Sequence, residues 1–198
     1  MASSEQDEHR RSVFREYVRS IDPRRFVFVD ECSTNISLSP IYARAPKGER
    51  AHGKAPRNWG KNISLISAIG ADGVKPSMTT EGAVDGLAFE TYLEHFLLPA
   101  LKAGQIIVMD NRSVHKSRRA KELIEQKGAA LLFLPAYSPD FNPIEGIFSK
   151  LKGILRKAEA RTQGVLVEAM GRALSAISRQ DIAAFFAHCG YRLPLQLL

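Results

Sequence analysis

The feature that most constrains this chain is a pair of short apolar runs, each followed directly by an aspartate. Residues 106–109 read Ile-Ile-Val-Met and precede Asp110. Residues 26–29 read Phe-Val-Phe-Val and precede Asp30. Unbroken apolar runs of this kind are typical of strands buried on both faces of an α/β sheet. If the two strands are parallel neighbours, both aspartates emerge at the carboxyl edge, where open α/β sheets place their sites.

A third apolar run, residues 131–135, leads into a segment that predicts the start of a helix. The run ends in a proline, and the residues after it are rich in Pro, Ser, Asp and Asn. Asn142 is predicted as the N-cap, with Pro143 at the first helical position and Glu145 in the first turn. The helix then continues with apolar residues at helical spacing and with Lys and Arg residues off that face.

The remaining patterns predict a single α/β domain. An amphipathic helix within residues 1–24 is predicted to precede it as a linker, and further strands are predicted at 36–42, 62–69 and 74–80. Other helices are predicted at 86–103, 116–127, 162–177 and 179–188. Strands first, and then an alternation of helix and strand, indicate a mixed sheet flanked by helices. Residues 193–198 are expected to form a tail.

Composition limits the class of protein and its partners. The chain has 198 residues, 44% hydrophobic and 25% charged, which suits one domain with a substantial core. Its formal net charge of +7 favours a polyanionic partner, nucleic acid first and an acidic membrane surface second. No apolar run approaches the roughly 18 residues of a membrane span, and the polar N-terminus does not resemble a signal peptide. We expect a cytoplasmic protein in which Cys32 and Cys189 are reduced thiols.

Asp30, Asp110 and Glu145 each have a structural explanation beside the functional one. Asp30 would suit a turn at a strand end, and Asp110 a turn or the cap of the next helix. Glu145 follows the N-cap candidate by three residues, the position of the acid in a capping box. Together, however, the three acids bring like charges close, which is costly unless a cation neutralises them. Oxygen ligands favour Mg²⁺ or Mn²⁺, and a pair of such ions suits phosphodiester chemistry.

Residues 44–61 predict a basic surface loop. Glycine and proline punctuate this segment, and Glu49 is its single acid, against Arg44, Lys47, Arg50, Lys54, Arg57 and Lys61, with the lone tryptophan Trp59. Lysine and arginine side chains can neutralise DNA phosphates, and an aromatic ring can stack on a base. The loop is therefore a candidate DNA clamp. The alternative is a solvated loop in which the tryptophan packs onto the core.

Three stretches resemble the catalytic domain of DDE transposases, in particular the bacterial insertion-sequence group related to the mariner elements. The stretches are residues 28–31 (Phe-Val-Asp-Glu), residues 108–111 (Val-Met-Asp-Asn) with His115-Lys116, and residues 134–145 (Leu-Pro-Ala-Tyr-Ser-Pro-Asp-Phe-Asn-Pro-Ile-Glu) followed by Lys150-Leu151-Lys152. The resemblance covers residues 26–191, nearly the whole chain. The last motif is long and specific.

This resemblance implies a ribonuclease-H-like fold with a five-stranded mixed sheet and a DDE catalytic domain over residues 25–192. It implies that Asp30, Asp110 and Glu145 are both catalytic and metal-binding. Two Mg²⁺ ions per active site are expected, with Mn²⁺ as a substitute. The implied reaction is hydrolysis of DNA at the element ends, followed by strand transfer to target DNA.

The same resemblance suggests partners and further site residues. Asn111, His115 and Lys116 are expected to bind DNA. His115 and Lys116 could contact the scissile strand or position a water, and a structural hydrogen bond at the helix start is the alternative for His115. DNA ends and target DNA are the expected partners, bound by a homodimer in synapsis, with no membrane partner. A bacterial origin would place the protein in the cytoplasm, associated with the nucleoid.

Two features depart from the family pattern. Members usually carry helix-turn-helix domains before the catalytic domain, whereas only residues 1–25 precede the first predicted strand here. Either a separate helix-turn-helix polypeptide recognises the ends, or the chain is a truncated copy. Arg112-Ser113-Val114 stand where the family tends to have small residues, which puts the local geometry in question. The alternatives to a transposase are a non-catalytic DNA-binding remnant and a stand-alone nuclease of the same fold.

Overall fold

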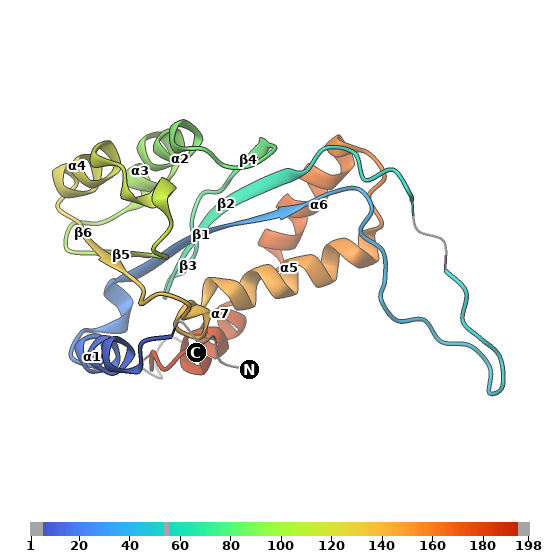
Figure 1. The fold of residues 1–198 in the computed structure, drawn as a ribbon, viewed down its shortest axis with the longest axis horizontal. Helices are drawn as coiled ribbons and strands as arrows, with labels where there is room; N and C mark the ends of the chain where they lie inside the picture. The colour runs from blue at the N-terminus through green and yellow to red at the C-terminus, as the bar shows by residue number, and fades with distance from the viewer. Residues whose placement is uncertain (1–5, 54–55, 194–198) are drawn as a thin grey trace.

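The computed structural model describes residues 6–53 and 56–193, and these form a sheet with helices on both faces (Figure 1). The strands are β1 (Phe26–Thr34), β2 (Ile63–Gly70), β3 (Gly73–Val74), β4 (Met78–Glu81), β5 (Ile106–Met109) and β6 (Ala130–Phe133). The α-helices are α1 (Glu8–Arg19), α2 (Gly86–Tyr92), α3 (Leu98–Ala100), α4 (Arg118–Gln126), α5 (Ile144–Ala158), α6 (Gln163–Ser175) and α7 (Arg179–His188). A π-helical turn, η2 (Leu93–Leu97), joins α2 to α3, and the short 3₁₀ turns are η1 (Pro23–Arg25), η3 (Ser113–Lys116) and η4 (Pro139–Phe141).

The sheet is mixed, as the sequence predicts. Its strand order is β3-β2-β1-β5-β6, and β4 pairs with β2 beside β3. β1 pairs with β2 in antiparallel fashion, whereas β1, β5 and β6 run parallel to one another. The predicted adjacency of the two apolar runs is therefore confirmed, with Phe28 opposite Val108 in the register.

Two strand predictions are wrong. Residues 36–42 form no strand, because the Oδ1 atom of Asn35 accepts hydrogen bonds from the backbone and the hydroxyl of Ser37 and turns the chain out of the sheet. β1 itself continues to Thr34, so Asp30 lies within the strand and not at its end. The strand expected at 74–80 is divided into β3 and β4, with residues 75–77 between them, and the sheet is six-stranded where five strands were expected.

The two faces of β1 pack against different helices. Side chains alternate across a strand, so Phe26 and Phe28 join one core with residues of α5, α6 and α7. Val27 and Val29 join the other core with residues of α2 and α4. Figure 1 shows these two sets of helices on opposite sides of the sheet. Asp30 continues the series of Phe26 and Phe28, and its side chain therefore lies on the α5 side.

α1 packs on the body of the domain. The ring of Phe14 stacks on the ring of Phe141 with centroids 5.3 Å apart. The buried guanidinium of Arg11 forms two hydrogen bonds with the carboxylate of Asp140, at 2.9 and 2.7 Å. The predicted amphipathic helix is therefore present, and it is part of the folded unit and not a free linker. No helix in the described part of the chain has the length and apolar character needed to span a membrane.

Candidate active site

Asp30, Asp110 and Glu145 line one cavity of about 440 Å³. β1 and β5 are parallel and in register, so Asp30 and Asp110 lie at the same level of neighbouring strands. Glu145 is in the first turn of α5, which packs on β1 from the side toward which Asp30 points. The remaining wall comes mainly from residues 134–139, the segment between β6 and η4. The fold thus brings the three acids to a shared cavity from three separate elements.

Asp30 is a buried carboxylate with a hydrogen bond to each oxygen. Its side chain accepts from the backbone of Glu31 through Oδ1 and from the Nδ2 atom of Asn142 through Oδ2, both at 2.8 Å. Burial raises the pKa of Asp30 to about 7, and the negative charges of Glu31, Asp110 and Glu145 add to this rise. A carboxylate in this position is ionised at neutral pH only in part, unless a nearby cation compensates its charge.

Asp110 is held in the ionised form. Burial alone would raise its pKa, but the hydrogen bond from His115, at 2.6 Å, and another from the backbone of Arg112 outweigh burial and lower the pKa. The two aspartates are therefore pushed in opposite directions by their surroundings. Opposite shifts in a pair of neighbouring acids are a mark of functional sites.

His115 lies behind the cavity and is fully buried. Its second nitrogen, Nε2, is 3.1 Å from Oε2 of Glu31, and its ring packs on Phe89. Burial favours the neutral ring, but the hydrogen bonds to Asp110 and Glu31 prevail and raise the pKa of His115 to about 9. Both ring nitrogens are therefore engaged inside the protein. This arrangement is the one expected of the alternative, a structural hydrogen bond, and the contact with the scissile strand stays a prediction.

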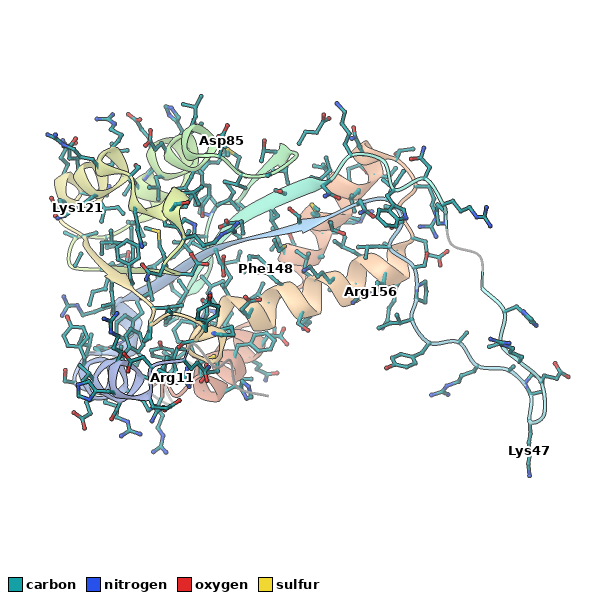
Figure 2. The ribbon with its side chains drawn as sticks, in the orientation of Figure 1. Arg11, Lys47, Asp85, Lys121, Phe148 and Arg156 are labelled. Carbon is teal, nitrogen blue, oxygen red and sulfur yellow. The ribbon has the colours of Figure 1, made fainter. Side chains whose placement is uncertain are left out.

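Most of the other predicted DNA-binding side chains are on the surface. Asn111 lines the cavity, and Lys116 is exposed in η3. Arg44, Lys47, Arg50, Arg57 and Lys61 are exposed on the loop between β1 and β2, and Trp59 is 66% exposed, so it does not pack onto the core. This loop projects far from the body, with Lys47 near its tip (Figure 2). Lys61 forms an ion pair with Glu81, and the predicted contact at Lys54 falls outside the described residues.

Three residues around the cavity were missed or misassigned by sequence reasoning. Asn142 is not the N-cap: α5 starts after Pro143 without a side-chain cap, and the amide of Asn142 instead bonds Asp30. Glu31 orients His115, although nothing in the local pattern distinguishes it from an ordinary strand residue. Arg11 binds the turn that precedes α5 through Ser138 and Asp140, and its only sequence signal is a charged residue in an amphipathic helix.

The donor set fits a divalent cation in its chemistry. All three acids offer oxygen, which suits Mg²⁺ and Mn²⁺, and Asp30 is a buried acid surrounded by other negative charges. In residues 6–53 and 56–193, no three His, Cys, Asp or Glu side chains are close enough together to hold an ion. The three carboxylates therefore line one cavity, but they are farther apart than three ligands of a single bound ion would be.

Comparisons with known proteins identify the class to which this fold and cavity belong. Residues 25–166 match the model of the DDE superfamily endonuclease family, so the chain belongs to that family. The architecture is the ribonuclease-H-like fold of the Mos1 transposase catalytic domain. The chain superposes on the Mos1 transposase paired-end complex with left transposon end with a TM-score of 0.76 at 20% identity, covering 96% of this chain and 61% of that one.

Two further relatives define the extent of the match. The catalytic domain of Mos1 mariner transposase superposes with a TM-score of 0.66 at 15% identity, covering 96% of this chain and 90% of that one. The Transposable element Tcb2 transposase of Caenorhabditis briggsae is 25% identical over 108 residues, which are 52% of this chain and 40% of that protein. The chain thus spans less than two thirds of the full-length relatives, and matches nearly all of an isolated catalytic domain.

Proposed function

We propose that this chain is the catalytic domain of a DNA transposase, which hydrolyses phosphodiester bonds at element ends and transfers the freed strands to target DNA. One observation carries the proposal: a buried aspartate with a raised pKa shares a cavity with two other acids in a member of the DDE superfamily. Asp30, Asp110 and Glu145 are the proposed catalytic and metal-binding residues. The proposed cofactor is Mg²⁺, replaceable by Mn²⁺, with two ions per site. Mos1 paired-end complexes have been described with Mn and with Mg.

Each acid has a distinct role in this proposal. When bound, the ions neutralise phosphate charge and make water a better nucleophile at neutral pH. Asp110 stays ionised because His115 donates to it, and so remains a metal ligand across the neutral range. Asp30 is fixed by two hydrogen bonds and offers its remaining lone pairs to the cavity. Glu145 is exposed in the first turn of α5, and its carboxylate would be the third acidic ligand.

The surroundings of the cavity suit DNA. Asn111 lines the cavity with Asp110, Lys116 is exposed six residues after Asp110 in the chain, and the projecting loop carries exposed arginines and lysines that can neutralise phosphates. The Mos1 complexes contain transposon-end DNA by their description. We further propose a homodimer in synapsis, end recognition by helix-turn-helix segments that precede this domain or belong to a separate polypeptide, and a bacterial insertion-sequence origin with association to the nucleoid.

The direct test is nicking of supercoiled plasmid by the purified chain in Mn²⁺ or Mg²⁺. We expect nicking by the wild type, and loss of at least two orders of magnitude of activity in Asp30→Asn and Glu145→Gln, whose side chains keep their volume but lose the charged ligand. Circular dichroism establishes that each variant is folded. Undiminished metal-dependent nicking by Glu145→Gln would refute the assignment.

One observation favours a second candidate function, a non-catalytic DNA-binding remnant. The three acids do not form a closed metal-binding group in the described part of the chain. The two functions are separated by the same assay together with a DNA-binding measurement. A remnant would bind duplex DNA in a salt-dependent manner and leave plasmid intact in Mn²⁺, whereas a transposase domain would do both.

A further inference from the structure

Asn142 connects two elements of the candidate active site. Its side chain is 3% exposed, and its Nδ2 atom donates a 2.8 Å hydrogen bond to Oδ2 of Asp30, a residue 112 positions away in the chain. An ionised carboxylate only accepts hydrogen bonds, so in the ionised form of Asp30, which is the form that would bind a cation, the NH₂ group of the amide is the side that faces it. Asn142 stands immediately before Pro143, at the entry to the helix that carries Glu145.

The other half of the same amide is unsatisfied. The Oδ1 atom of Asn142 is buried and has no hydrogen-bond partner among the described residues. A buried acceptor without a partner destabilises a protein, so an asparagine here is a poor choice for stability. An apolar side chain of similar size would fill the space without this penalty. The hydrogen bond to Asp30 is therefore the feature of Asn142 that distinguishes it from a packing residue.

The bond limits how Asp30 can turn. The backbone of Glu31 donates to Oδ1 from within β1, and Asn142 donates to Oδ2 from the α5 side. With one donor on each oxygen, rotation of the carboxylate breaks at least one hydrogen bond. The lone pairs that remain face the cavity shared with Asp110 and Glu145, and Asn142 lines that cavity too.

The turn that presents Asn142 is itself held from two sides. Arg11 of α1 bonds Ser138 and Asp140 (Figure 2 marks Arg11 on this helix). On the inner side, the buried hydroxyl of Tyr191 donates to the carbonyl oxygen of Phe141 at 2.9 Å. A turn held in this way can place an amide with the accuracy that a hydrogen bond to a metal ligand needs.

We propose that Asn142 is a positioning residue: its amide fixes the carboxylate of Asp30 for binding of a divalent cation and couples the placement of Asp30 to that of Glu145. This inference rests on the proposed function, because it assumes that Asp30 is a metal ligand. The sequence pattern predicts a helix cap at Asn142, and the proposal assigns this residue a different role.

The test compares two substitutions of Asn142. A positioning role and a packing role predict opposite orders of Mn²⁺ affinity for these two variants. Asn142→Leu keeps the branched shape of the side chain with no loss of volume and removes the donor. Asn142→Ser loses volume and keeps a hydroxyl donor, with room for a bridging water. We expect Mn²⁺ affinity of the full chain, measured by calorimetry with MnCl₂ alone, to fall about 10–100-fold in Asn142→Leu, the usual loss when a hydrogen bond to a metal ligand is removed. Asn142→Ser is expected to lose much less. If Asn142→Leu does not fold, Asn142→Ala replaces it, since alanine also lacks a donor.

A packing role predicts the reverse pattern. Asn142→Leu would then bind Mn²⁺ like the wild type, and Asn142→Ser would have the lower melting temperature and the weaker binding; this result would overturn the proposal. Asn62→Leu is the matched control, because it removes an amide that accepts a hydrogen bond from Asn35 at the base of the projecting loop, away from the cavity. Its Mn²⁺ affinity is expected to equal that of the wild type.

Asp30→Asn separates failure of this inference from failure of the proposed function. If the wild type does not bind Mn²⁺, or if Asp30→Asn binds it equally well, Asp30 is not a metal ligand and both proposals fall. If Asp30→Asn abolishes binding while Asn142→Leu leaves it unchanged, only the role of Asn142 is refuted.

Discussion

The Nδ1 atom of His115 lies 2.6 Å from Oδ1 of Asp110. The opposite ring nitrogen, Nε2, lies 3.1 Å from Oε2 of Glu31, so one buried imidazole links a cavity acid to an acid on the neighbouring strand. Glu31 is also paired with Arg112, the second residue after Asp110. The rear of the candidate site is therefore a network of charges, in which each cation neutralises an acid that would otherwise be destabilising.

Removing the imidazole is expected to damage both stability and activity. In His115→Gln, the amide can donate to one of the two acids but not to both. Loss of one partner from a buried charge pair costs about 3 kcal/mol, and misorientation of a metal ligand reduces activity about 10–100-fold. Urea denaturation and plasmid nicking in Mn²⁺ measure the two effects. A double-mutant cycle with Glu31→Gln should give a coupling energy well above zero, and additive effects would show that the two residues act independently.

Arg11 is expected to stabilise the turn before α5. Arg11→Leu keeps apolar contact with Phe141 but loses both hydrogen bonds to Asp140, an acid whose pKa the guanidinium holds below its usual range. Because Asp140 is half exposed, we expect a loss near the lower end for a charged hydrogen bond, about 1.5 kcal/mol. Arg10→Leu is the control, since Arg10 is 79% exposed in its pair with Asp7, and its effect should stay within about 0.5 kcal/mol. Equal losses in the two variants would contradict a specific role for Arg11.

Two glycines of α5 should respond to alanine in opposite directions. A Cβ on Gly146 would clash with three ring atoms of Phe185 in α7, whereas a Cβ on Gly153 would meet nothing within 4 Å. Gly153→Ala should therefore stabilise the protein by up to about 1 kcal/mol, because alanine favours the helix. Gly146→Ala should destabilise it by about 1–3 kcal/mol through overpacking. Its nicking activity should also fall, since Glu145 is the adjacent residue. Similar shifts in the urea midpoint for the two variants would show that Phe185 of α7 can move away from the new methyl group at little energetic cost.

At acidic pH, the stability of the fold should depend on the ionisation of Asp181. The hydrogen bond from Lys150, with those from the backbone and hydroxyl of Ser178, lowers the pKa of Asp181 to about 2, from an ordinary value of 3.8. A depressed pKa means that the ionised acid stabilises the fold. This stabilisation is complete above pH 3.8 and is lost as the pH falls through 2. The difference in melting temperature between wild type and Asp181→Asn should shrink over that interval. A constant difference between pH 5 and pH 2 would contradict the assignment.

The projecting loop should control the salt dependence of DNA binding. Binding affinity falls with salt because phosphate contacts release counterions, and each contact contributes about 0.9 to the slope of log K against log salt. Alanine at Lys47 or Arg50, which are exposed, should reduce the slope by about that amount. Lys61→Ala should reduce it less, because Lys61 is already paired with Glu81. Fluorescence anisotropy with a duplex at several KCl concentrations measures the slope. A wild-type affinity independent of salt would exclude the loop as a phosphate clamp.

The strands and helices that carry the acids could be predicted because their signals are local. Each apolar run needs two covered faces, and that requirement indicates central strands for Asp30 and Asp110. Their parallel adjacency was a condition of the prediction, and the register confirms it. Glu145 follows a proline at a helix start, which is again a matter of adjacent residues. The strand expected at 36–42 failed for a local reason too: the turn formed by Asn35 and Ser37 ends the extended conformation.

The supporting contacts could not be predicted in this way. Asn142 reaches Asp30 across 112 positions, His115 reaches Glu31 across 84, and Arg11 reaches Asp140 across 129. No periodicity or spacing encodes a pair so distant, and for Asn142 and His115 the local pattern suggested another role. His115 illustrates the consequence: its position after Asp110 suggests contact with DNA, whereas burial makes it an internal partner of two acids.

By itself, the sequence determined which residues form the central strands and that the sheet is mixed, because hydrophobic periodicity and the order of strands and helices can be read from short segments. Only the tertiary structure decided how the three acids are held and how they ionise. Desolvation and hydrogen bonding depend on what folding brings to within a few ångströms, and this is why Asp30 and Asp110, alike in sequence, have pKa values shifted in opposite directions.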